Sequence, residues 1–252
     1  GASMIMPNVL AISMGFVMAL VVSGSLAGVE LTIAQELQFV VGKSPLQAGL
    51  FLMPMVIASA LGGPIAGFVV AMMGLRMVAF LSLLISAGSL IGLGLSDFHD
   101  PGWQVPTLMA TLGFFLSVGL TASSIAIMSS APADKAGAAG ALEGTGYELG
   151  AGLGITIFGV LLASSFTNAL RVPAELAGAV GDAAMQSIGE AMIVAERLGN
   201  DGLALAEAAR TAFTSAHMSV LLAAGSVITL LSLAVLVALR NFRDEDVATA
   251  EH

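Results

Sequence analysis

The sequence predicts an all-α membrane protein with six transmembrane helices and a helical hairpin outside the membrane between the fifth and the sixth. Of the 252 residues, 57% are hydrophobic and only 10% are charged, whereas soluble domains carry roughly 25% charged residues. The mean hydropathy is +0.98. Six stretches are also apolar enough and long enough to cross a hydrocarbon core of about 30 Å, which takes about 20 helical residues.

The predicted spans follow one another with short connections, except before the last. They cover residues 8–30, with an extension toward Phe39, and then 46–73, 77–95, 105–130, 138–165 and 216–239. The chain therefore divides into helices one to five (1–165), an extracytoplasmic segment (166–213), the sixth helix (214–240) and a cytoplasmic acidic tail (241–252).

The segment 166–213 is too polar to span a membrane, yet its apolar residues recur with helical spacing. Pro173 and Glu175 favour the start of a helix, and the run 199–202 favours a turn. We therefore expect an amphipathic helical hairpin; a loosely ordered, alanine-rich loop is the alternative. The residues at four- and eight-residue spacing are Leu176, Val180, Ile188 and Met192.

Cations in the short connections predict the orientation. Lys43 is the one cation of the short loops on the opposite side from the termini. Because cytoplasmic loops carry an excess of Lys and Arg, both termini are expected in the cytoplasm. No cleavable signal peptide is evident. The cations on the terminal side are Arg76, Lys135, Arg240 and Arg243.

Several function classes receive no support. The net charge of −9 and the absence of Cys disfavour a nucleic-acid binder, a disulfide scaffold and a thiol enzyme. No Ser-His-Asp set, phosphate loop or two-His motif occurs in a suitable context, so we expect no enzyme, no cofactor and no metal site. His99 and His217 are lone histidines near span ends, where they are usually tolerated, and Trp103 is expected to anchor the interface.

Three carboxylates lie inside the predicted spans: Glu30 in the first, and Glu143 and Glu148 in the fifth. A charge at a helix centre costs about 2.5 to 3.5 kcal/mol on the insertion scale. No Lys or Arg falls within any predicted span. These groups must therefore be protonated, hydrated or paired with a cation from outside the chain, which predicts proton or cation binding. Hydrogen bonding to a neighbouring helix is the structural alternative.

The fifth span also carries a stripe of small residues. Gly146, Gly150 and Gly154 repeat every four residues, which allows another helix to approach closely. Glu143 falls within the arc of this stripe, whereas Glu148 projects about 140° away from it. On an ideal helix these two carboxylates cannot clamp one small group.

Two motifs resemble the 14-helix drug:proton antiporter branch of the major facilitator superfamily. The run 35–50, ELQFVVGKSPLQAGL with its preceding Gln, and Pro54 are similar to the signature that joins the first two helices of the C-terminal half. The run 67–76 resembles the superfamily's cytoplasmic loop: Gly67, Gly74 and Arg76 are retained, while Ala71 and Met72 replace its acidic and basic pair.

A third motif, GALEGTGYELG at 140–150, resembles the penultimate helix of QacA-like and SmvA-like pumps. By that match, Glu143 and Glu148 take part in proton coupling and cationic drug recognition. Gly144 stands where some relatives have a second acidic residue. The resemblance implies one half of a major facilitator fold, with the N-terminal half as the missing partner.

The resemblance implies a proton-coupled multidrug efflux transporter of the bacterial inner membrane. Its ligands would be protons and lipophilic cations such as quaternary ammonium compounds, with Glu148 exchanging protons for drug, Glu143 assisting and Glu30 as a third acidic site. Two alternatives stay open: a membrane scaffold or regulatory bundle without transport, and an exporter of another small metabolite.

Overall fold

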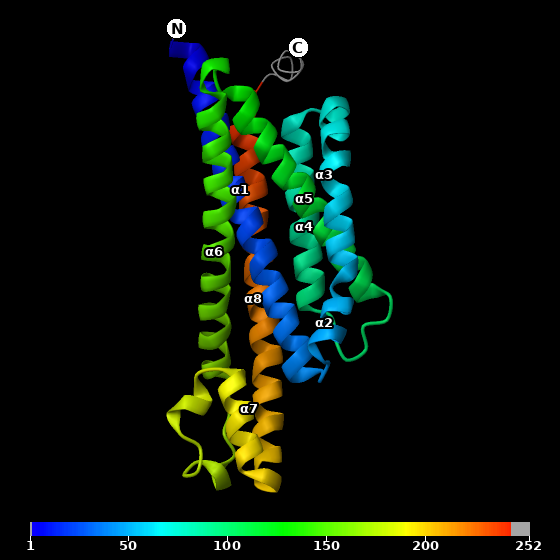
Figure 1. The fold of residues 1–252 in the computed structure, drawn as a ribbon, viewed down its shortest axis with the longest axis vertical. Coiled ribbons are helices and arrows are strands. Elements are labelled where there is room, and N and C mark those ends of the chain that lie inside the picture. The colour runs from blue at the N-terminus through cyan, green and yellow to red at the C-terminus, as the bar shows by residue number, and fades with distance from the viewer. Residues whose placement is uncertain (1, 243–252) are drawn as a thin grey trace.

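The computed structural model describes residues 2–242, and within them the chain forms α-, 3-10 and π-helices and no strand. The helices pack into an elongated bundle (Figure 1). Six of them are long and apolar enough to cross a membrane, so the predicted all-α membrane fold is confirmed. The six helices, with any short helical extensions, are Ile5–Val40, Met53–Met73, Leu75–Gly94, Gln104–Ser130, Ala133–Ala169 and Gly199–Ala238.

The first span is longer than predicted. Helix α1 covers Ala2–Gln35, and a π-helix, η1, continues it over Glu36–Val40. The amide of Val41 donates to the carbonyl of Glu36 at 3.0 Å, the five-residue spacing of a π-helix. Such turns are rare and occur frequently at functional sites.

The second predicted span consists of two helices that meet at Leu52. Helix α2 covers Pro45–Phe51 and α3 covers Met53–Met73. The sequence starts α2 by a capping box, in which Ser44 Oγ accepts from the amide of Gln47 and the Gln47 side chain accepts from the amide of Ser44. Proline suits the first helical position, because an amide hydrogen there would have no partner within the helix and its absence costs nothing.

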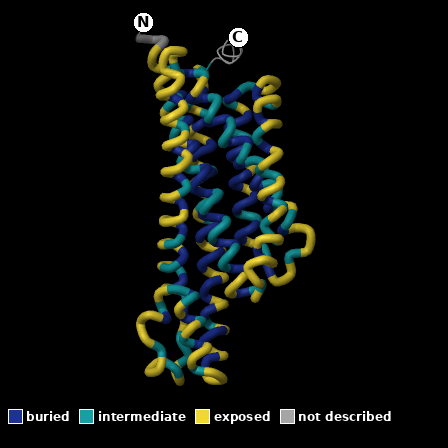
Figure 2. Tube along the Cα trace, viewed as in Figure 1, coloured by how far each residue is buried: buried dark blue, intermediate teal, exposed yellow. Residues whose placement is uncertain are grey.

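Helix α1 lies at the centre of the packing, against α5 (Gln104–Ser130), α6 (Ala136–Ala169) and α8 (Gly202–Ala238), while α4 (Leu75–Gly94) packs against α5 and α8. Helices α3 and α6 flank the bundle and are the least buried of the six spans. Figure 2 shows exposed residues along both. Because much of each flank is apolar, these faces suit lipid or another membrane segment.

The glycine stripe of α6 lies against α1. Gly146, Gly150 and Gly154 are buried against α1. A Cβ at Gly150 or Gly154 would collide with α1 backbone. The close approach also lets the Ser23 hydroxyl of α1 donate to the carbonyl of Tyr147 at 3.0 Å, which satisfies a polar group without water.

The segment between α6 and α8 forms a helical hairpin, in which α7 packs against the start of α8, but its first arm begins later than predicted. No α-helix starts at Pro173; the chain makes two 3-10 turns, η3 (Ala174–Leu176) and η4 (Asp182–Met185), before α7 (Ile188–Arg197). Glycines at 178 and 181 interrupt the helical spacing that Leu176 and Val180 suggested. After a last turn, η5 (Gly199–Asp201), α8 runs without a break from Gly202 to Ala238, so the second arm of the hairpin and the sixth span are one helix.

Both ends of the described chain lie at the same end of the bundle, and α7 lies at the other (Figure 1). At the first of these ends, η2 (Ala133–Lys135) leads into α6. The predicted tail, from residue 243 on, and Arg243 with it, lies outside the described residues.

Candidate functional site

Glu143 and Glu148 border one cavity of about 310 Å³ on the flank of α6. Glu143 is half-buried and Glu148 is exposed, which agrees with their different angles on the helix. Both nevertheless reach the same hollow, together with Tyr147, because the cavity wraps around the α6 surface beside Ala19 of α1 and Leu120 of α5. The separation in angle therefore does not prevent both side chains from lining one cavity.

The cavity contains two acidic side chains and no basic one among its lining residues. Lys135 precedes α6 and Arg76 begins α4, at the ends of their spans. An arriving cation would therefore meet no like charge in the wall of this cavity, and Tyr147 offers an aromatic face, which attracts cations.

Glu30 is half-buried on α1 and lines neither this cavity nor the one described next. The structure thus brings Glu143 and Glu148 together and leaves Glu30 at a separate place.

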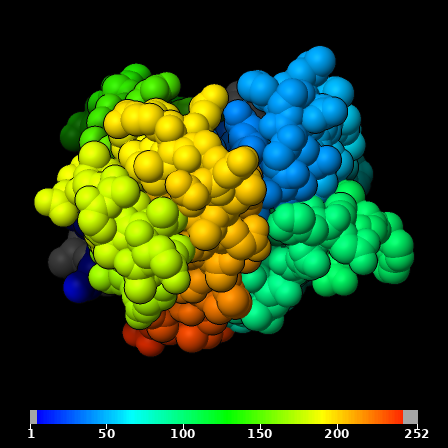
Figure 3. Space-filling view, turned by 90° about the horizontal axis from the view of Figure 1, so that it is seen from below, coloured from blue at the N-terminus to red at the C-terminus, as the bar shows by residue number. Residues whose placement is uncertain are grey.

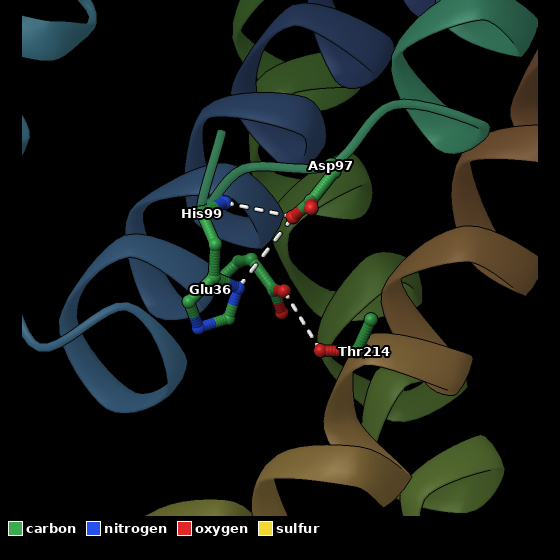
Figure 4. Close-up of polar contacts among 4 residues, drawn as sticks. All are labelled: Glu36, Asp97, His99 and Thr214. Atoms are coloured by element: carbon green, nitrogen blue, oxygen red, sulfur yellow. Dashed lines mark hydrogen bonds and ion pairs between the residues drawn. The ribbon is translucent and has the colours of Figure 1, made fainter. Parts of the chain in front are cut away.

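A second polar cluster lies near the end of the bundle that carries α7, and the sequence did not reveal it. Glu36, at the start of the π-helix, is 2% exposed, and its Oε1 accepts a 2.8 Å hydrogen bond from the Thr214 hydroxyl of α8 (Figure 4). Asp97 and His99 of the α4–α5 loop lie beside it, with 3.6 Å between Asp97 Oδ1 and His99 Nδ1. Figure 3 views the molecule from this end.

The sequence offered one signal for this cluster: an acidic residue inside a long apolar run that could extend to Phe39. His217 lines the same cavity and is buried within the bundle, at 2% exposed. The ring packs edge-on against Phe98, with 5.0 Å between ring centroids. Trp103, in contrast, is 80% exposed, as an interfacial anchor would be.

Gly67, Gly74 and Arg76 lie where α3 ends and α4 begins, and Gly74 and Arg76 have packing roles there. Gly74 joins α3 to α4 with φ +86°, a conformation that other residues avoid. The Arg76 Nε donates to the carbonyl of Leu236 at 2.6 Å, near the C-terminal end of α8, where carbonyls lack helical partners. Gly67 is exposed, with no neighbour at its Cβ position.

No group of three or more His, Asp or Glu side chains within residues 2–242 could hold a metal ion.

No family model matches the chain. Curated relatives do. The methyl viologen resistance protein SmvA of Salmonella typhimurium strain LT2 is 49% identical over 219 residues, which cover 86% of this chain and 44% of SmvA. The multidrug efflux pump LfrA of Mycolicibacterium smegmatis is 33% identical over 196 residues, 75% of this chain and 38% of LfrA.

A third relative, the tetracenomycin C resistance and export protein of Streptomyces glaucescens, is 30% identical over 184 residues, which cover 69% of this chain and 34% of that protein. The chain thus spans less than half the length of each of these relatives. The chain is a membrane protein with six helices within residues 2–242 that could cross a bilayer, and its curated relatives are drug-resistance and drug-efflux proteins.

Proposed function

We propose that this chain is the C-terminal six-helix half of a proton-coupled multidrug efflux transporter of the major facilitator type. It would export lipophilic cations such as quaternary ammonium compounds. The observation that carries the proposal is the acidic cavity on α6, in which Glu143 and Glu148 meet beside Tyr147 with no basic residue in the wall. Relatives described as resistance and efflux proteins support it.

The proposed cycle needs one carboxylate that binds either a proton or a drug cation. Glu148 is exposed on the flank of α6, where an incoming substrate reaches it first, and Glu143 lies deeper. In the cycle, a drug cation from the cytoplasm binds ionised Glu148, and a proton from outside displaces it. Glu143 adds a second negative charge near the site and strengthens the attraction.

Two observations support a missing partner: the chain spans less than half the length of its relatives, and the flanks formed by α3 and α6 are the least buried spans. Transporters of this kind bind substrate near the midplane between two halves. We propose that an N-terminal half covers the acidic cavity and completes the binding site. With both termini cytoplasmic, α7 and its preceding turns face the outside of the bacterial inner membrane.

The test is efflux of a cationic dye from cells that carry the complete transporter, with Glu148→Gln in this half. We expect this variant to lose efflux at unchanged membrane expression, since Gln cannot carry the charge. Glu175→Gln, on the exposed stretch before α7, is the matched control and should retain efflux. Unimpaired efflux by the Glu148 variant would refute the assignment.

A further inference from the structure

At the end of α1, where a loop would ordinarily follow the helix, the chain continues as a π-helix. This π-helix carries a carboxylate. Glu36 is the first residue of this π-helix and is 2% exposed. The wider π turn adds a residue to the helical turn, and Glu36, Leu37 and Val40 within it are buried. A π-helix is rare and is found frequently at functional sites. Its presence here indicates that the buried Glu36 has a function.

Three buried side-chain atoms in this place have no hydrogen-bond partner: Oε2 of Glu36 and the two ring nitrogens of His217. Oε1 of Glu36 accepts from Thr214, but its Oε2 is buried and makes no hydrogen bond. His217 lies one turn after Thr214 on the same face of α8, and neither of its ring nitrogens makes a hydrogen bond of normal geometry, although the Thr32 backbone faces the ring. Buried polar atoms without partners are costly and uncommon in folded proteins.

Both groups line one cavity of about 250 Å³. It is lined by the buried Glu36 and His217, by the exposed Thr214 of α8, and by Asp97 and His99 of the α4–α5 loop. The side chains of His99 and Asp97 are 58% and 68% exposed. The cavity therefore runs from the surface to the unpartnered atoms and is large enough to admit water.

The charges around Glu36 come from few elements. The α4–α5 loop contributes Asp97 and His99, and α8 contributes His217; α2 and α7 place no titratable group in the cavity wall. Two cations of neighbouring segments have contacts of their own: Lys43 lies 5.6 Å from the centre of the Phe51 ring, and Arg210 donates to the carbonyl of Phe39 at 3.4 Å. No Lys or Arg lines this cavity to neutralise an ionised Glu36.

We propose that Glu36 and His217 form a proton-binding site that exchanges protons with the solution at the α7 end of the bundle, through the mouth flanked by Asp97 and His99. A proton adds to Oε2 of the Glu36 carboxylate and gives the neutral acid, which loses it again to the same solution or to the His217 imidazole. A proton suits this place better than a metal ion, because a proton needs one acceptor and a metal ion needs three or more ligands.

This inference rests on the proposed function, because a proton-driven exporter must take up protons from the outside, where α7 would lie. Proton binding by Glu36 can still be measured without any transport. Loss of efflux in the Glu148 variant and protonation of Glu36 are therefore independent results.

The experiment is infrared difference spectroscopy of the whole chain in lipid nanodiscs, between about pH 5 and about pH 9, a range that brackets the titration of most perturbed carboxylic acids. Buried carboxylic acids absorb at a higher frequency than hydrated ones. We expect a high-frequency carboxyl band that appears on acidification and is lost completely in Glu36→Gln. Glu207→Gln, on the exposed face of α8, is the matched control and should keep the band.

A second variant keeps the test decisive if Glu36→Gln does not fold. Thr214→Val removes the hydroxyl that donates to Glu36 at nearly constant shape. The band should move to higher frequency in this variant, since the acid then makes one hydrogen bond fewer, and it should not vanish. A band that survives in Glu36→Gln, that does not change with pH, or that ignores Thr214→Val would overturn the proposal.

Discussion

Gly24 of α1 and Gly154 of α6 pack backbone to backbone, with no side chain between them. A Cβ on Gly24 would lie 2.7 Å from the carbonyl oxygen of Gly150, and a Cβ on Gly154 would collide with the backbone of Gly24. This contact sets how closely α6, with its two glutamates, approaches the centre of the bundle.

We expect Gly154→Ala to destabilise the protein by about 1 to 3 kcal/mol, the usual cost of overpacking a close contact. The backbone of α1 cannot move aside as a flexible side chain would. Thermal unfolding in detergent, followed by circular dichroism, measures the change.

The matched control is Gly152→Ala on the same helix, where no atom lies within 4 Å of the Cβ position. Alanine should stabilise the helix slightly there, by about 0.5 to 1 kcal/mol. Equal stabilities of the two variants would show that α1 and α6 do not meet at Gly154.

Arg76→Ala should loosen the end of α8. Its Nε donates to the carbonyl of Leu236 at 2.6 Å, and a hydrogen bond from a charged group contributes about 1.5 to 3 kcal/mol. Hydrogen exchange of the last turn of α8 should therefore become faster. Lys135→Ala, an exposed cation at the same end of the bundle, should leave that exchange unchanged, and a similar effect of both variants would contradict a specific contact.

Ser187→Ala should fray α7. Ser187 Oγ accepts from the amide of Glu190 at 3.3 Å and caps the helix, and removal of such a cap costs about 1 kcal/mol. Hydrogen exchange at the start of α7 reports the loss. Ser187→Asp should restore protection, because Asp also caps helices; if it does not, the cap does not support α7.

Glu143→Gln should weaken drug efflux by about tenfold in the complete transporter, a change of about 1.4 kcal/mol, and less than Glu148→Gln does. Glu143 is half-buried beside the cavity and Glu148 is exposed to it, so the first adds attraction while the second makes the contact. Dye efflux at matched expression gives the comparison. An equal or larger loss in the Glu143 variant would reverse the two roles.

The acidic cavity on α6 could be predicted in part. The spacing of Gly146, Gly150 and Gly154 places them on one face of α6, because helical angles follow from residue numbers alone. The same angles put Glu143 and Glu148 on different faces of α6, and the structure has them so. Helical angles alone could not show that one cavity is lined by both side chains. Its shape depends on Ala19 and Leu120 from two other helices.

The sequence by itself determined the number of spans and the polar character of the segment before α8, because hydropathy and length act residue by residue. Only the tertiary structure decided that Glu36 and His217 are buried in one polar cluster. Thr214 lies 178 positions from Glu36. The burial of His217 depends on Phe98, which lies in the α4–α5 loop. Such contacts depend on packing between distant segments, and neither composition nor periodicity encodes them.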